Sequence, residues 1–133
     1  KKIQNYLKKK KIKFIKRPSI LCGETPLIDV YNQVYNKIKK KYKIKIIAGV
    51  QCDHPDRQHS LDNVIKIFKK RKVDLLYSMD KKRKKNGAHY IFKTKVLSGK
   101  NNIKKTYIFD ECTNIHYMSD LLKAERKLKK YEN

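Results

Sequence analysis

The chain has 133 residues, enough for one domain with a buried core, and 39% of them are hydrophobic. These residues occur in short blocks, which indicates a folded chain, and no block approaches the roughly 20 apolar residues that a membrane span requires. The formal net charge is +24, but only five of the 36 basic residues are Arg. A solvated Lys-rich surface is therefore favoured over a specific nucleic-acid interface, which would use Arg for bidentate and stacking contacts.

Three cysteines, Cys22, Cys52 and Cys112, are widely spaced and form no CxxC pair. An odd number of cysteines without a secretory signal predicts reduced thiols in a cytoplasmic protein. The sequence starts with KKIQ, without Met or a signal-peptide pattern, which predicts a chain that is cut at its front.

The first third of the chain predicts a helix, a strand and a second helix. The spacing of apolar residues predicts the end of a helix at 2–10. Alternation of Lys with Ile and Phe predicts a short strand at 11–16. Thr25 followed by Pro26 predicts the N-cap and first position of an amphipathic helix over 26–41.

The remaining two thirds alternate between strand and helix patterns. The continuous apolar run 44–50 predicts a buried parallel strand, and Ser60 is predicted to cap a helix over 61–71. Further predicted elements are a strand at 73–79, a basic loop at 80–87, strands at 89–93, 106–109 and 113–116, and a helix at 118–130. This alternation predicts a single α/β domain over 1–133, with a Rossmann-like mixed, mostly parallel sheet flanked by helices.

The densest polar cluster of the chain directly follows the apolar run 44–50 and has the sequence QCDHPDR. Ligands of open α/β sheets bind beyond the carboxyl ends of strands, so this cluster is the predicted site. Asp53 is an oxygen ligand suited to Mg²⁺, Gln51 could hydrogen-bond a sugar or base, and Arg57 could pair with a phosphate. The alternative is a polar turn in which Asp53 only caps the turn or the following helix.

This cluster resembles a motif of the nucleotidyltransferases that activate acidic sugars with CTP. In the CMP-Kdo synthetases a strand ends in Gln-x-Asp-x-Pro, matched here by Gln51, Asp53 and Pro55, and the Asp of that motif holds magnesium. The corresponding segment of CMP-sialic-acid synthetases is matched by Gln51, Pro55 and Arg57. The resemblance therefore implies that Asp53 holds Mg²⁺.

Three further segments resemble the same family in the same order, so the resemblance covers nearly the whole chain. Residues 14–31 resemble the strand, Arg-Pro, loop and helix that precede the motif, and Arg17 is a candidate contact to a nucleotide or phosphate. Residues 86–97, NGAHYIFKTKVL, resemble a segment that borders the sugar pocket, which implies that Asn86 helps to hold the acceptor or base. Residues 114–125, NIHYMSDLLKAE, resemble the closing strand and helix.

The sequence departs from the family pattern in two places. The glycine-rich loop that holds the CTP phosphates has no counterpart among its four glycines, so the resemblance implies a domain that lacks its first strand–loop unit. The position of a second metal-site Asp is occupied by His116, a poor Mg²⁺ ligand that could contact a phosphate or another part of the substrate. Asp120 is the other candidate metal ligand, although an Asp there more often caps the last helix.

The resemblance implies the C-terminal part of a cytidylyltransferase of the nucleotide-diphospho-sugar transferase type. Such an enzyme transfers CMP from CTP to an acidic sugar or a related surface-glycan precursor, and this chain alone is expected to be inactive or nearly so. The family often dimerises, which allows a homodimer. No specific nucleic acid and no membrane is expected as a partner.

Other function classes stay open beside the enzyme. The Lys-rich surface could belong to a basic RNA-binding or regulatory module without catalysis, and the chain could be a degenerate relative retained for dimerisation. Zinc is less favoured, because Cys52, His54, Cys112 and His116 lack the usual spacing of structural zinc ligands. A nucleophilic Cys52 is also disfavoured, because no positioned base accompanies it.

Overall fold

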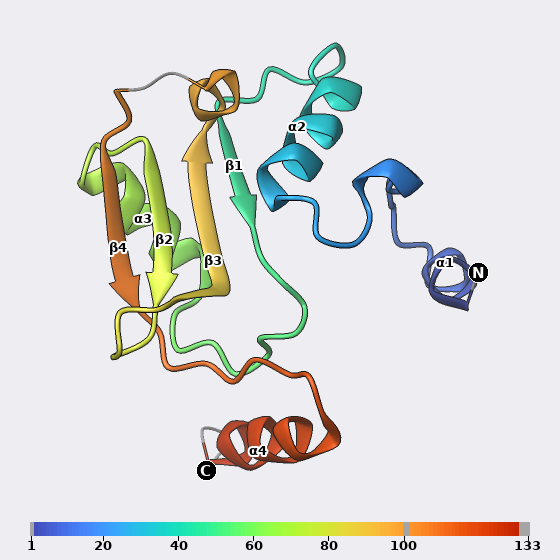
Figure 1. The fold of residues 1–133 in the computed structure, drawn as a ribbon, viewed down its shortest axis with the longest axis vertical. Coiled ribbons are helices and arrows are strands. Elements are labelled where there is room, and N and C mark those ends of the chain that lie inside the picture. Colours follow the sequence, from blue (N-terminus) through green and yellow to red (C-terminus); the bar gives the residue numbers. More distant parts are fainter. Residues whose placement is uncertain (1, 100–101, 131–133) are drawn as a thin grey trace. The chain divides into compact units, whose positions relative to one another are not determined.

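The computed structural model describes residues 2–99 and 102–130 (Figure 1). They form two compact units, one that ends at Lys43 and one that begins at Ile44. The first unit is helical, and the second combines a four-stranded mixed sheet with helices, which confirms the predicted α/β class. No helix among the described residues has the length and apolar character needed to span a membrane.

The first unit contains α1 (Lys2–Lys9), the 3-10 helix η1 (Ser19–Leu21) and α2 (Leu27–Ile38). The strand predicted at 11–16 is wrong: this segment pairs with no described strand, and a strand needs a neighbour to bond its backbone groups. The predicted N-cap of α2 is also wrong. Pro26 takes the N-cap position without a side-chain bond, and the Thr25 hydroxyl donates instead to the Cys22 carbonyl at 3.2 Å.

The second unit is built on a sheet with the strand order β1-β3-β2-β4. Its elements are β1 (Ile46–Gly49), α3 (Leu61–Lys70), β2 (Leu75–Met79), β3 (Lys85–Lys93), the 3-10 helix η2 (Thr94–Ser98), β4 (Lys105–Phe109) and α4 (Met118–Lys129). β3 is antiparallel to β1 and β2, whereas β4 is parallel to β2. Three strands therefore point one way and β3 points the other way (Figure 1).

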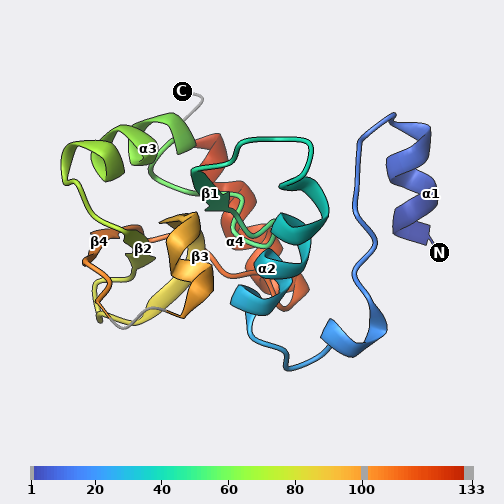
Figure 2. The same ribbon diagram turned by 90° about the horizontal axis from the view of Figure 1, so that it is seen from above.

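The core of this unit lies between α3 and one face of the sheet (Figure 2). The predicted cap of α3 is confirmed, because Ser60 Oγ accepts a hydrogen bond from Asn63 N at 3.3 Å. α3 buries Val64 and Phe68 completely, as expected from its apolar spacing. They pack against Val73, Leu76, Ile91 and Ile108.

Four expectations for this unit need correction. The sheet is not mostly parallel, because two of its three strand pairings are antiparallel. β1 is not a parallel strand between parallel neighbours: its one partner among the described strands is antiparallel β3, which lies between β1 and β2. The predicted loop 80–87 is too long, since β3 begins at Lys85. Residues 113–116 form no strand, because their backbone bonds a side chain and a loop carbonyl rather than a sheet edge.

Candidate functional site

The candidate site lies at the edge of the sheet where β1, β2 and β4 end and β3 begins (Figure 1). The QCDHPDR segment leaves β1 at this edge, and Gly87 near the start of β3 meets it there. Segments that are about 35 residues apart along the chain thus form one polar surface, where strand direction predicts ligand binding.

One carboxylate oxygen of Asp53 is hydrogen-bonded, and the other has no hydrogen bond from the described residues. Its Oδ1 lies 2.8 Å from His54 Nδ1, and its side chain is 40% exposed. Its Oδ2 accepts no hydrogen bond from the described residues. Since ionised carboxylate oxygens are ligands that Mg²⁺ prefers, this single open oxygen fits an ion that takes its other ligands from phosphates and water.

His54 is buried, with 1% of its surface exposed, and both of its ring nitrogens have partners. The Gly87 backbone N–H donates to Nε2 at 3.3 Å, so Nε2 must be the unprotonated nitrogen. The neutral ring then carries its proton on Nδ1, which donates to Asp53. Backbone of β3 is thereby linked through His54 to the predicted metal ligand.

Gln51 and His54 both lie close to Gly87. A Cβ atom at Gly87 would lie 1.7 Å from Gln51 Oε1 and 2.8 Å from His54 Cε1. The two backbones are also bonded, with Gln51 N donating to Gly87 O at 3.2 Å. The predicted substrate-binding amide is therefore packed against β3 at the same edge as Asp53.

Arg57 braces the backbone of the site. Its Nε donates to the Ala88 carbonyl at 3.0 Å, and its Nη2 donates to the Gln51 carbonyl. These bonds connect the segment that follows β1 with β3 and use part of the guanidinium's hydrogen-bonding capacity. Its contact with a phosphate stays a prediction, and the structure shows Arg57 in a supporting position.

Asn86 bonds β2, β3 and the residue after β4 rather than extending into open space. Its Oδ1 accepts from the Ser78 hydroxyl and from Ala88 N, and its Nδ2 donates to the Asp110 carbonyl at 2.8 Å. Both ends of the amide are thus engaged by the protein. Its predicted contact with an acceptor or base would require some of these bonds to be exchanged.

Asp56, which the sequence did not single out, anchors the segment 110–117 to the site. Its carboxylate accepts from Thr113 N at 2.7 Å, from the Thr113 hydroxyl at 2.8 Å and from Lys127 Nζ at 2.9 Å. Burial raises the pKa of this carboxyl, but the bonds from Thr113 and Lys127 outweigh burial and hold the pKa below its ordinary value. Only the sequence neighbourhood of Asp53 could have suggested Asp56.

Asp110 is a second buried carboxylate that sequence reasoning missed. Both of its oxygens accept from Gln58 N at 3.2 Å, and Oδ2 lies 3.6 Å from His89 Nε2. Burial raises the pKa of Asp110, whereas His89 and the Gln58 backbone lower it, and the lowering prevails. Burial, with the carboxylates of Asp110 and Asp56, raises the pKa of the neighbouring Cys112 thiol to about 12.

His116 and Asp120 have different positions in the structure. Asp120 Oδ2 accepts from Tyr117 N at 2.9 Å and from His116 N at 3.1 Å, so it caps the start of α4. These bonds hold the pKa of Asp120 below its ordinary value. His116 is exposed and follows Ile115, whose N–H donates to the Asp53 carbonyl at 2.9 Å, so His116 lies on the segment that borders Asp53.

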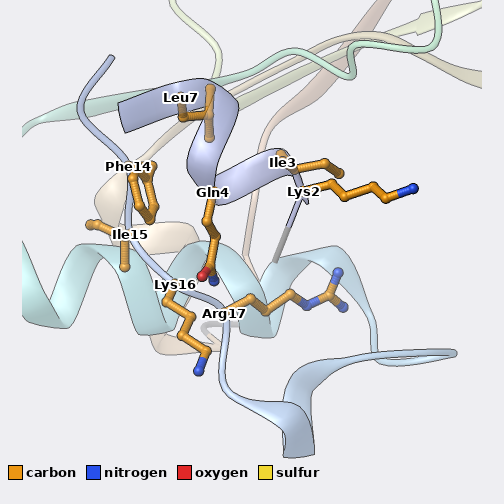
Figure 3. A pocket seen from close by; sticks show the side chains of 8 residues that line it. All are labelled: Lys2, Ile3, Gln4, Leu7, Phe14, Ile15, Lys16 and Arg17. Carbon is orange, nitrogen blue, oxygen red and sulfur yellow. The ribbon is translucent and has the colours of Figure 1, made fainter. Parts of the chain in front are cut away.

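Arg17 belongs to the first unit, where it lines a pocket beside α1 (Figure 3). Gln4 extends from α1 toward the segment that carries Lys16 and Arg17. Apolar side chains of Ile3, Leu7, Phe14 and Ile15 also line this pocket. The pocket is made entirely by residues of this unit, so Arg17 is described apart from the Asp53 site.

Neither a cluster of metal ligands nor a matching family supplements this geometry. Across residues 2–99 and 102–130, no group of three or more His, Cys, Asp and Glu side chains is arranged to hold a metal ion. Asp53 is thus the candidate ligand, with Asp120 engaged as a cap. No protein-family model and no curated protein matches the sequence.

Proposed function

We propose that this chain is part of a CTP-dependent nucleotidyltransferase that forms a CMP-activated acidic sugar or a related glycan precursor. One observation carries the proposal: the Asp53 carboxylate is held by His54 and keeps its other oxygen open, at the edge where three strands end. The order Gln51, Asp53, Pro55 in the segment after β1 supports it. The common direction of β1, β2 and β4 supports a Rossmann-like domain of the nucleotide-diphospho-sugar transferase type.

In the proposed reaction an acceptor oxygen attacks the α-phosphorus of CTP. The bond from that phosphorus to pyrophosphate breaks, pyrophosphate leaves with the electron pair, and any hydroxyl proton passes to solvent. Asp53 would hold Mg²⁺, which neutralises phosphate charge when bound. Gln51 lies where it could orient the acceptor or base, and His116 lies on the segment that borders Asp53.

The 133 residues include no glycine-rich loop that could surround the triphosphate with backbone N–H groups. We therefore expect the chain alone to bind the nucleotide weakly and to release little or no pyrophosphate. Release of pyrophosphate from CTP at the rate of an ordinary enzyme would contradict this expectation.

Binding of Mn²⁺ with CTP, rather than turnover, therefore tests the site. Mn²⁺ accepts the same oxygen ligands as Mg²⁺ and broadens the NMR signals of nearby amides. We expect broadening of the amides of Asp53, His54 and Gly87 in the labelled chain, and its loss in Asp53→Asn. Asp62→Asn, which removes an exposed carboxylate from α3, is the matched control. Equal broadening in wild type and Asp53→Asn would reject the proposal.

A second candidate function, binding of single-stranded nucleic acid, is favoured by a row of aromatic side chains on β2 and β4. Tyr77 and Tyr107 have ring centroids 6.4 Å apart, Phe109 follows at 5.4 Å, and Lys85 Nζ lies 4.7 Å from the centre of the Tyr77 ring. Tyr107 is 38% exposed and Phe109 is 47% exposed. Bases stack on such rings, and Lys side chains attract the phosphates.

Two variants, Tyr107→Ala and Asp53→Asn, distinguish the two candidate functions. Salt-sensitive binding of labelled oligouridine that is lost in Tyr107→Ala and retained in Asp53→Asn would favour the nucleic-acid function. Mn²⁺·CTP binding that is lost in Asp53→Asn and retained in Tyr107→Ala would favour the enzyme.

A further inference from the structure

The orientation of the Asp53 carboxylate depends on a buried neighbour that lies between it and β3. Asp53 stands on a loop and is 40% exposed, so its side chain would otherwise turn freely about its own bonds. The one hydrogen bond to this carboxylate among the described residues comes from His54, at 2.8 Å. A metal ligand needs a fixed direction, and partners that bond a ligand's other atoms supply it.

We infer that His54 is the positioning residue of the metal site: it holds Oδ1 of Asp53 so that Oδ2 faces the ion. This inference rests on the proposed function of Asp53. It adds a role for a residue between the Asp and the Pro of the motif, where neither composition nor the motif itself required histidine.

The arrangement of hydrogen bonds determines what His54 can do. A backbone N–H can only donate, so the bond from Gly87 N requires a lone pair on Nε2. The Nδ1 proton must therefore point toward Asp53. Because the ring is 1% exposed, water does not compete for either nitrogen, and one neutral tautomer is retained.

Gly87 makes this arrangement possible. Its N–H fixes the tautomer of His54, and its missing side chain leaves room for the ring, since a Cβ there would lie 2.8 Å from His54 Cε1. The hydrogen bonds from Gly87 to His54 and from His54 to Asp53 thus set the orientation of the metal-binding oxygen. β3 contributes to the site without offering a ligand of its own.

A purely space-filling histidine is the competing explanation, and two substitutions separate it from positioning. His54→Asn keeps a donor near the place of Nδ1 and loses the acceptor for Gly87. His54→Gln can place its terminal carbonyl near Nε2, which keeps the Gly87 bond and loses the donor to Asp53. Both variants remove the ring, so a space-filling role predicts similar effects of the two changes.

The experiment measures the affinity for Mn²⁺·CTP by titration, together with Tm. We expect His54→Asn to bind within about threefold of wild type and His54→Gln to bind about 10- to 100-fold more weakly. His59→Asn is the matched control, because His59 bonds a backbone carbonyl, that of Phe109, and should leave the affinity unchanged. Equal affinities of the Asn and Gln variants would overturn the inference.

A second measurement needs neither metal nor variant. Nitrogen-15 NMR of the histidine rings distinguishes the two neutral tautomers, and we expect His54 to carry its proton on Nδ1. A ring protonated on Nε2 would overturn the inference even if Mn²⁺·CTP binds at Asp53. Absence of Mn²⁺·CTP binding in wild type, with the Nδ1 tautomer present, would instead reject the proposed function and with it the role of His54 at a metal.

Discussion

Substitution of Gly87 by Ala tests the close approach between β3 and the segment after β1. The added Cβ would lie 1.7 Å from Gln51 Oε1, 2.4 Å from Gln51 Cδ and 2.8 Å from His54 Cε1. The first two atoms belong to the end of a flexible side chain and can move, whereas the buried ring of His54 cannot move without shifting its hydrogen bonds.

Overpacking of this kind usually costs about 1–3 kcal/mol, which for a chain of this length corresponds to a fall in Tm of roughly 3–10 °C. We expect Gly87→Ala to fall in this range and to bind Mn²⁺·CTP more weakly than wild type. Removing Gln51 as well, in Gln51→Ala/Gly87→Ala, should restore part of the stability, because only the contact with His54 remains.

Gly99→Ala is the matched control for the loss of a glycine. Gly99 has φ 68° and no atom within 4 Å of an added Cβ, so its substitution costs about 1–2 kcal/mol through backbone strain alone. Gly87 has no positive φ, so its requirement is steric. A Gly87→Ala variant with the Tm of wild type and an unshifted His54 resonance would refute this account of the site.

Three further predictions concern the groups around the site. Because the folded-state pKa of Asp56 is below its ordinary value of 3.8, its stabilisation is complete above about pH 4 and is lost as the pH falls through the folded pKa. The free energy of unfolding, measured in urea, should therefore fall less toward acid pH in Asp56→Asn than in wild type. An equal pH dependence of the two proteins would contradict the pairing with Lys127. The pKa of Cys112, raised to about 12, keeps this thiol protonated at pH 8, so mass spectrometry should find iodoacetamide on the exposed Cys22 and Cys52 well before Cys112; fastest labelling of Cys112 would be the contrary result. Asp120→Ala should lower the free energy of unfolding by about 1 kcal/mol through loss of the cap, with unchanged Mn²⁺·CTP affinity, whereas a loss of affinity would restore Asp120 as a metal ligand.

Most of the helices and strands of the second unit could be predicted from the sequence. Apolar spacing and Ser60 predicted α3, and the run of apolar residues at 73–79 predicted β2, because these signals act between neighbours along the chain. The strand predicted at 11–16 failed for the opposite reason. An extended segment becomes a strand only when another segment pairs with it, which a local pattern does not specify.

The position of the candidate site follows from the sequence, since the polar segment after β1 and the rule for strand ends both point to Asp53. The sequence could not show that β3 lies between β1 and β2, because strand order depends on which long-range pairings bury the most apolar surface. Gly87, 33 residues from His54, bonds the His54 ring only because of this order.

The sequence by itself determined the α/β class, the helix cap at Ser60 and the polar segment that carries Asp53, whereas the structure showed that Asp120 caps α4. Only the tertiary structure decided that Arg57 and Asn86 bond the protein's own backbone and side chains, and that His54 orients the carboxylate. The physical reason is that residue type sets which bonds a side chain can form, whereas the packing of distant segments sets which partner it meets.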